Sequence, residues 1–177
     1  MNIVQNGLKK KLRINGIKFS TQLVQINLLN ASLSENIRPL FFQLLSQNQI
    51  NIPFSLLTCM GEKILLSCCV ESEDIDRIKK VVDKHPILKE NIEFISSVGA
   101  LSIFPHHSKL KLLGLSFYLL GKQHLSLYGM ASSISSLTFI MDYSQLDEAV
   151  SILLEYMDLP PNHTPFRPEI HVIQKKR

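Results

Sequence analysis

Few residues of this chain are arranged for chemistry. His106 and His107 are adjacent and could bind a metal ion, but no further ligands follow at a fixed spacing, and such a pair is more often a turn leading into a helix. Ser132, Ser133 and Ser135 have no histidine and acid in a spacing typical of nucleophilic catalysis, so we expect them in a loop between strands. The chain has no phosphate-binding glycine loop, no CxxC and no HExxH. We therefore predict no catalytic residues, no metal and no cofactor.

The three cysteines are expected to be reduced and structural. Cys59, Cys68 and Cys69 lie in apolar, strand-like runs, and their odd number does not suit a disulfide framework. Cys68 and Cys69 are adjacent, so their side chains would point to opposite faces of a strand. This disfavours metal binding and redox chemistry.

Backbone groups offer a better candidate site than side chains do. The turns at 30–36 and 104–109 are each expected to precede a helix, whose free N–H groups and dipole favour a carboxylate. A free amino acid has such a carboxylate, and Glu35 or Asn51 could hold its ammonium group. The alternative is that the serines of these turns only cap the two helices, since a cap is required with or without a ligand.

Composition sets the class of protein. A chain of 177 residues with 45% hydrophobic and 19% charged residues can bury one large core or two smaller ones. The net charge of +4 comes largely from the basic residues of 9–13 and 175–177, which we interpret as solvated tails, and not as a nucleic-acid surface. No apolar run approaches the roughly 20 residues that span a bilayer, and the N-terminus lacks a signal-peptide core. We expect a cytoplasmic protein without membrane or nucleic-acid partners.

The clearest pattern is an internal repeat with an offset of 75 positions. The recurring residues are Leu40, Phe42, Leu44, Leu45, Ile50 and Ile52, matched by Leu115, Phe117, Leu119, Leu120, Leu125 and Leu127. Each copy has an apolar stretch of helical period, a polar break and an alternating run. Two copies of one supersecondary unit are the simplest interpretation.

In the first copy we predict a strand over 23–29, a helix that starts near Glu35 or Asn36, and strands over 50–58 and 63–70. A second helix should follow the possible N-cap Ser72 and end at Pro86.

The second copy repeats this order. We predict a strand over 91–98, a long turn over 99–107, and a helix from Ser108 that stops at Gly121 as a left-handed cap. Strands over 125–131 and 136–143 follow, and the last helix begins at Ser144, which with Asp147 resembles a capping box.

Each copy thus reads strand, helix, strand, strand, helix, the order of a ferredoxin-like sandwich without its last strand. The segment 12–19 could supply that strand to the second copy, or it could form a local hairpin at Asn15 and Gly16. The local pattern alone does not choose between the two.

These residues resemble the paired ACT domains that form the regulatory half of aspartokinases. The matching motifs in the second copy are Val98 with Gly99, Phe117 with Leu120, the strand 125–130, and the serine-rich segment 132–136. In the first copy they are Phe42 with Leu45 and the triplet Ile50, Asn51 and Ile52. Ile14, Gly16 and Ile17 resemble the stretch that in this family supplies a strand to the second ACT domain, which favours the strand over the hairpin.

The resemblance covers about 12–158 and implies an α+β fold of two ferredoxin-like βαββαβ (ACT) sandwiches packed together, the second completed by the N-terminal strand. It places the first ACT domain at 20–88, the second at 89–159 plus 12–19, and an irregular tail at 160–177.

The resemblance also implies function. We expect a non-catalytic regulatory module, lacking the kinase domain, that binds an amino-acid effector such as lysine, threonine or methionine where ACT domains meet, in a homodimer. The effector-binding residues that it implies are Asn30, Ser32, Glu35, Asn36, Ile37, Asn51, Ile52, His107, Ser108, Ser133 and Ile134.

Four residues favour an alternative. The glycine that the family has at each helix start aligns with Asn36 and Lys111, and its acidic and glutamine positions align with Pro53 and Leu57. A side chain at the glycine position restricts a ligand's approach to the backbone, and an apolar side chain cannot hold an ammonium group. The alternative is therefore a dimerisation or interaction module with degenerate effector pockets. Association is also suggested by Leu112, Leu115 and Leu119, which lie outside the expected apolar stripe of their helix.

Overall fold

The computed structural model describes residues 11–32, 36–60, 63–105 and 109–167. Its elements are β1 (Leu12–Phe19), β2 (Leu23–Ser32), α1 (Ile37–Gln47), β3 (Phe54–Met60), β4 (Lys63–Glu71), α2 (Ile75–Val82), α3 (Pro86–Asn91), β5 (Ile92–Pro105), α4 (Lys109–Lys122), β6 (Leu127–Ser132), β7 (Leu137–Asp142), α5 (Leu146–Leu154) and β8 (Met157–Asp158). Short 3-10 turns, η1 (Ser72–Asp74) and η2 (Tyr143–Gln145), precede α2 and α5. The predicted α+β class is confirmed.

The described chain divides into two compact units. The first unit is 22–99, and the second unit consists of 11–21 and 100–167. The division falls within β5, so the beginning of this strand belongs to one unit and its end to the other.

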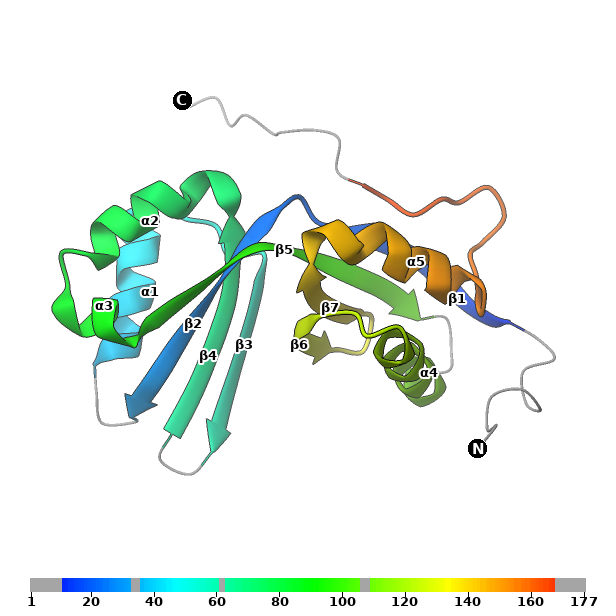
Figure 1. Cartoon of the computed structure of the whole chain (residues 1–177), viewed down its shortest axis with the longest axis horizontal. Coiled ribbons are helices and arrows are strands. Elements are labelled where there is room, and N and C mark those ends of the chain that lie inside the picture. Colours follow the sequence, from blue (N-terminus) through cyan, green and yellow to red (C-terminus); the bar gives the residue numbers. More distant parts are fainter. Residues whose placement is uncertain (1–10, 33–35, 61–62, 106–108, 168–177) are drawn as a thin grey trace. The chain divides into compact units, whose positions relative to one another are not determined.

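In the first unit the strand order is β3-β4-β2-β5, with antiparallel pairing throughout. Alternate residues of β2 and β4, such as Ile26 and Leu66, are buried against Phe41 of α1, Ile78 of α2 and Leu88 of α3. Apolar residues recur every second position in the strands and about every 3.6 positions in the helices, so the sheet and the helices bury their apolar faces against each other and exclude water. In Figure 1 all three helices lie on the same side of these strands.

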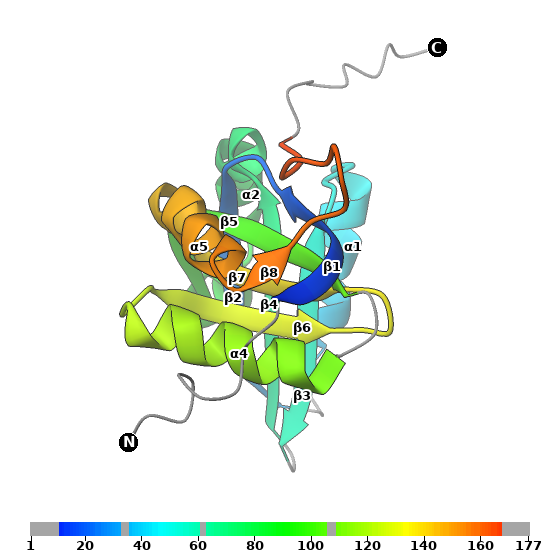
Figure 2. The same ribbon diagram turned by 90° about the vertical axis from the view of Figure 1, so that its right-hand side faces the viewer.

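The second unit contains β6, β7, the end of β5, β1 and β8. β1 pairs antiparallel with β5 along one edge and parallel with β8 along the other (Figure 2). Ile17 and Phe19 of β1 share a buried core with Leu101 and Ile103 of β5 and with both helices, α4 and α5. The predicted pairing of the N-terminal strand with the second copy is confirmed. The hairpin alternative is wrong, because β1 runs through Asn15 and Gly16 with only an irregularity in register at that point.

The long turn predicted over 99–107 is also wrong within the described residues, since β5 continues to Pro105. Gly99 suggested a break, but Leu101 and Ile103 are buried in alternation with half-exposed neighbours. Their pairing with Phe19 and Ile17 of β1 supplies hydrogen bonds that local sequence does not reveal.

The apolar stripe of α4 differs from the prediction. Leu112, Leu115 and Leu119, expected outside the stripe, are buried in the core of the second unit, whereas Leu110 is 85% exposed. Leucines occur on several faces of this helix, so their spacing alone did not identify which face is buried.

The end of α4 was also predicted wrongly, because the helix runs past Gly121 to Lys122 and the left-handed residue is His124, with φ 55°. Its counterpart 75 positions earlier, Gln49, has φ 54°. The backbone hydrogen bonds match as well: Gln49 donates to Ser46 (3.0 Å), and His124 donates to Gly121 (3.1 Å). The repeat seen in the sequence is thus reproduced at the end of each first helix.

Several boundaries shift by a few residues. β3 begins at Phe54 and β6 at Leu127, because Ile50 and Leu125 are buried connectors after the helices. α2 ends at Val82, and Pro86 starts α3 instead of ending α2. Proline suits the first helical position because its missing N–H would have no partner there.

The predicted capping box at Ser144 and Asp147 is replaced by another cap. The Asp142 side chain accepts from the Ser144 N–H (2.9 Å) and hydroxyl (2.6 Å) at the start of η2. Hydrogen bonds from the Ser144 hydroxyl and then its backbone N–H lower the pKa of the Asp142 carboxyl.

Candidate functional site

The first predicted effector turn lies between β2 and α1. Asn30 and Ser32 are in the last part of β2, and Glu35 falls outside the described residues. Asn36 is exposed at the N-cap of α1 and makes no capping hydrogen bond with its side chain. Ile37 is only 1% exposed and packs in the core of the first unit. As far as the residues from Asn36 onward are concerned, α1 thus begins without a side-chain cap, and Ile37 anchors the helix.

Asn51 and Ile52 lie at the other end of the same unit. They precede β3, whose first residue pairs with Cys69 of β4, whereas Ser32 pairs with Lys63. Lys63 and Cys69 are six residues apart, about 20 Å along an extended strand. Figure 1 shows the connection that follows α1 and the start of α1 at opposite ends of the strands. The first unit therefore does not bring Asn36 and Asn51 together.

The second predicted turn is only partly described. His107 and Ser108 fall outside the described residues, as does His106. Ser133 and Ile134 form part of the turn between β6 and β7, and Ile134 is 85% exposed.

The Ser133 hydroxyl is used within its own turn. Its oxygen accepts from the N–H groups of Ser135 (3.2 Å) and Ser136 (3.1 Å). The serine cluster therefore shapes a hairpin turn, consistent with the expectation of a loop between strands.

A cavity that sequence reasoning missed lies in the second unit. It is open to solvent on one side, has a volume of about 580 Å³ and is lined by Arg13, Ile14, Asn15, Asp158, Leu159, Pro160 and Pro161. The volume lies within the range of small-molecule sites. Arg13 was interpreted as part of a solvated basic tail, but it is in β1 and is the register partner of Asp158 in β8. The pairing of β1 with β8, which are far apart in sequence, brings these residues together. A local sequence motif therefore could not predict the cavity.

The charges at this cavity are incompletely matched. Lys11 Nζ donates to the Leu154 carbonyl (2.8 Å) and lies 3.8 Å from Asp158 Oδ1. Within the described part of the chain, Arg13 forms no hydrogen bond or ion pair through its side chain. Within the same described residues, the cavity thus has an unpaired guanidinium group beside a carboxylate that is 55% exposed.

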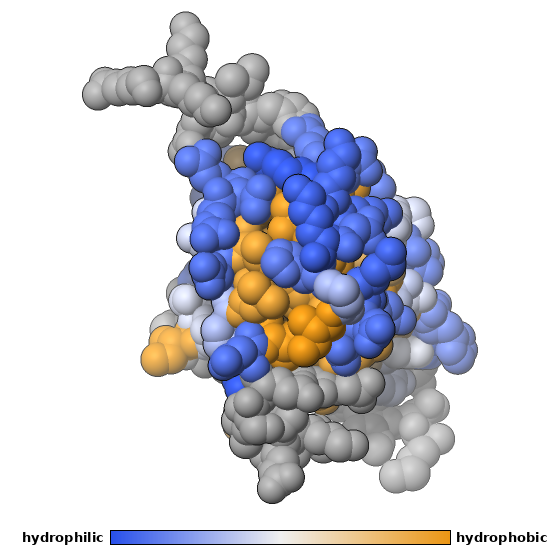
Figure 3. Space-filling view, turned by 90° about the vertical axis from the view of Figure 1, so that its left-hand side faces the viewer, coloured by the Kyte–Doolittle hydropathy of each residue, from blue (hydrophilic) through white to orange (hydrophobic). Residues whose placement is uncertain are grey.

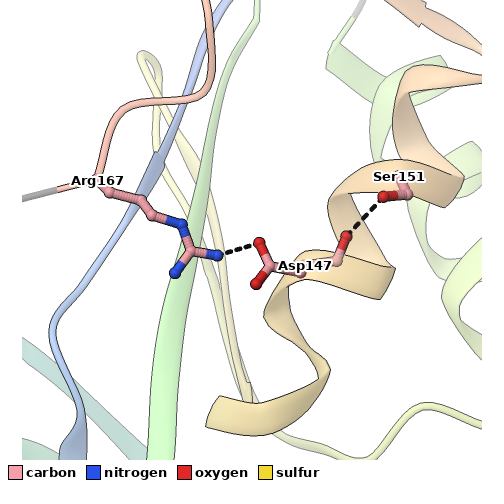
Figure 4. A network of polar contacts seen from close by, with 3 residues as sticks. All are labelled: Asp147, Ser151 and Arg167. Carbon is pink, nitrogen blue, oxygen red and sulfur yellow. Dashed lines mark hydrogen bonds and ion pairs between the residues drawn. The ribbon is translucent and has the colours of Figure 1, made fainter.

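One wall of the cavity belongs to the segment 159–167, which we call the C-terminal strap. The strap rejoins β1 at Phe166, whose N–H donates to the Ile17 carbonyl (2.8 Å) and whose carbonyl accepts from Phe19 (2.8 Å). Arg167 forms an ion pair with Asp147 of α5 (Figure 4), and its guanidinium carbon lies 4.3 Å from the centre of the Phe19 ring. Asp147 also accepts, through its carbonyl, from the Ser151 hydroxyl (2.9 Å). The strap is therefore held to both β1 and α5.

A second hollow lies between α1, α2 and α3 of the first unit. Its lining is apolar except for Asn48 and includes Phe41, Leu44, Leu45, Ile78, Val82 and Leu88. Figure 3 shows hydrophobic side chains gathered on the face of this unit. The lining has no charged group, so this hollow cannot pair with the charges of a free amino acid.

The thiols give no sign of reactivity. Cys68 and Cys69 are free and buried, and burial raises the pKa of each to about 12, with the neighbouring Cys68 adding to the effect at Cys69. A thiol that stays protonated is a poor nucleophile and a poor metal ligand. The expectation of reduced, structural thiols is confirmed for these two.

The described residues contain no cluster of three or more histidine, cysteine or acidic side chains able to hold a metal ion. None of their helices is long and apolar enough to cross a membrane.

Comparison with solved structures relates this arrangement to known proteins. The ligand-free regulatory subunit of aspartate kinase from Thermus thermophilus matches with a TM-score of 0.68 and 15% identity, over 81% of this chain and 97% of that one. The corresponding subunit from Thermus flavus matches with a TM-score of 0.70 and 15% identity, over 83% and 99%. The fold is that of aspartate kinase regulatory subunits. The resemblance inferred from the sequence is thus confirmed at the level of the fold.

A whole aspartate kinase shares this regulatory fold over part of its length. Escherichia coli aspartokinase III, solved in complex with lysine and aspartate, matches with a TM-score of 0.60 and 10% identity, over 85% of this chain but 34% of the enzyme. No family model matches the chain, and no curated protein matches it in sequence. The likeness to aspartate kinase regulatory subunits is therefore one of structure.

Proposed function

We propose that this protein is a non-catalytic regulatory module that binds a small amino-acid effector through its ACT-like units. The observation that carries the proposal is the match to separate regulatory subunits of aspartate kinase along 97% and 99% of their chains. The E. coli enzyme, whose regulatory fold also matches, was solved with lysine bound. Lysine, threonine and methionine are the effectors to test first.

The proposed effector contacts are those implied by the sequence, centred on Asn36 and Ile37 at the start of α1. An exposed helix N-terminus with no acid in its first turn favours a ligand carboxylate. Asn51 and Ile52 lie about 20 Å along the sheet from the start of α1. An effector that contacts these two residues as well as Asn36 and Ile37 therefore requires the surface of a second ACT domain. An effector bound between ACT domains meets this requirement.

Thermal unfolding with each of the twenty amino acids tests the proposal. A ligand present at about 100 times its Kd adds about 2.7 kcal/mol to the free energy of unfolding, which is readily seen as a higher Tm. We expect at least one amino acid to raise the Tm in a concentration-dependent way. If none of the twenty does so at millimolar concentration, the effector-binding function is wrong.

A dimerisation or interaction module with degenerate pockets is the second candidate. Specific observations favour it: Leu57 of β3 is half exposed, and the second unit exposes Leu110, Phe117, Tyr118 and Ile134. Exposed apolar side chains of this size are typical of association surfaces. Light scattering should give the mass of a dimer at micromolar concentration, and a monomer would count against both self-association and this candidate.

A further inference from the structure

We propose that the cavity of the second unit is a binding site for a free α-amino acid, with Arg13 binding its carboxylate and Asp158 its ammonium group. The proposal rests on the proposed function only for the ligand class, and none of the residues that line the cavity is among the effector residues named above.

The cavity exists because the chain leaves the edge of β1 and later returns to it. β8 pairs only with Leu12 and Arg13, and the strap next contacts β1 at the bridge between Lys18 and Phe166. After β8 come Leu159 and then Pro160 and Pro161, and proline has no N–H with which to continue a ladder. The edge of β1 between these two contacts is therefore left uncovered.

A turn fixes the strap in this course. His163 donates its backbone N–H to the Pro160 carbonyl (3.1 Å), and Asn162 has φ 64°, a left-handed conformation that asparagine tolerates well. On the opposite wall, Asn15 donates its side-chain amide to the Pro105 carbonyl (3.0 Å) at the irregularity of β1. Both walls are thus held in place without a ligand.

The charges match both ends of a zwitterion. Arg13 and Asp158 are register partners on adjacent strands, and neighbouring strands lie about 4.8 Å apart. They nevertheless form no ion pair with each other, and no described residue occupies the fork of the guanidinium group, which suits a ligand carboxylate. Among the described residues Asp158 has one ion-pair partner, Lys11 at 3.8 Å, and Lys11 already donates to a carbonyl. In an α-amino acid the carboxylate and the ammonium group are attached to the same carbon, so one ligand can pair with Arg13 and Asp158 at once.

The remaining wall indicates the ligand side chain. Leu159, Pro160 and Pro161 are apolar, and Arg13 and Asp158 are the charged residues of the lining. With those two used for the main-chain groups, a lysine or aspartate side chain would find no opposite charge left in the lining. The site therefore favours an amino acid with an uncharged side chain.

The test uses calorimetric titration of the whole chain. The twenty amino acids are screened, and the tightest binder is compared with its amide, which lacks the carboxylate, and its N-acetyl form, which lacks the ammonium group. We expect an uncharged amino acid to bind best and each derivative to bind at least about tenfold more weakly, as loss of a charge-assisted hydrogen bond predicts.

Two variants test which residue binds the ligand carboxylate and which binds its ammonium group. Arg13→Gln should remove the preference for the acid over its amide, and Asp158→Asn should remove the preference over the N-acetyl form. Lys122→Gln and Glu148→Gln change exposed charges elsewhere in the second unit and should bind as the unaltered protein does. Because all four positions are exposed, the Tm without ligand should be unchanged, which verifies folding.

Amide hydrogen exchange locates the site without any substitution. The ligand should slow exchange in 12–16 and 158–159. If an amino acid binds with equal affinity to Arg13→Gln and Asp158→Asn, or protects only the start of α1, the cavity proposal is wrong while the proposed function stands. If no amino acid binds at all, both fail.

Discussion

At the scale of single residues, the two repeats share a strained position. Gln49 and His124 adopt left-handed backbone conformations just after α1 and α4, where helices usually place glycine. A side chain costs roughly 1 kcal/mol in this region, since Cβ approaches the backbone closely.

We therefore expect Gln49→Gly and His124→Gly each to raise the free energy of unfolding by up to about 1 kcal/mol. Urea denaturation measures the change. Gln43→Gly, at an exposed position in the middle of α1, is the control and should lower the stability by a similar amount, because glycine is unfavourable inside a helix. Equal destabilisation by all three substitutions would contradict the argument.

A buried hydroxyl offers a second test. Ser116 of α4 is 0% exposed, and its Oγ has no hydrogen-bond partner among the described residues. An unsatisfied buried polar group costs about 1–3 kcal/mol, and alanine is also the better helix former.

Ser116→Ala should accordingly stabilise the protein by about 1–2 kcal/mol in chemical denaturation. Ser151→Ala is the control on α5, because the exposed Ser151 donates its hydroxyl to the Asp147 carbonyl and has little to gain. A loss of stability in Ser116→Ala would indicate that the hydroxyl is bonded after all.

The sequence predicted the burial of a residue well where its neighbours in the sequence determine its surroundings. Cys68 and Cys69 were expected as buried thiols from the apolar run around them, and they are. Arg13 was placed in a tail, because its role depends on Asp158 at the far end of the chain. No local pattern could join these two.

At the scale of elements, the strap connects β1 to α5 through few contacts. Arg167 stacks on Phe19 and pairs with Asp147, while Phe166 supplies two backbone hydrogen bonds. A cation over an aromatic ring contributes about 0.5–1 kcal/mol at an exposed site, and an exposed ion pair contributes less.

Replacing Arg167 by alanine should therefore cost about 1 kcal/mol at most, but it should speed hydrogen exchange at the Phe166 and Phe19 amides several-fold. Asp147→Ala separates the two interactions, since it keeps the stacking and removes only the ion pair. Unchanged exchange in Arg167→Ala would mean that the backbone bonds alone hold the strap.

The order of helices and strands was predictable, because the spacing of apolar residues distinguishes the two and the same pattern occurs in both copies of the repeat. The failures occurred where tertiary pairing overrode a local signal. Gly99 suggested a turn, yet pairing with β1 extends β5 to Pro105. β8, with only two residues, has no signal of its own and exists because Leu12 and Arg13 present an open edge.

At the scale of the whole molecule, each unit has its own core. Ile17 of β1 belongs to the core of the second unit, and Ile26 of β2 to that of the first. Both are almost fully buried, so truncation to alanine should remove about 2–5 kcal/mol.

We expect Ile17→Ala to lower hydrogen-exchange protection mainly in β1, β7 and α5, and Ile26→Ala mainly in β2, β4 and α1. Each variant is the control for the other. Identical protection maps for the two variants would show instead that the units unfold as one.

The candidate effector site could be predicted only in part at this scale. The repeat suggested equivalent turns before the first helix of each copy, but it could not reveal that Asn36 and Asn51 lie at opposite ends of one unit. Residues far apart in sequence meet according to strand order, which hydrophobic pattern does not specify.

The place of β1 has a consequence for how the protein forms during translation. Its partners, the end of β5 and β8, leave the ribosome long after it does, whereas 22–99 emerge as an uninterrupted stretch. The nascent chain therefore carries β1 as an unpaired apolar strand until β5 and β8 have been made, and during this interval it is exposed to aggregation and chaperone capture.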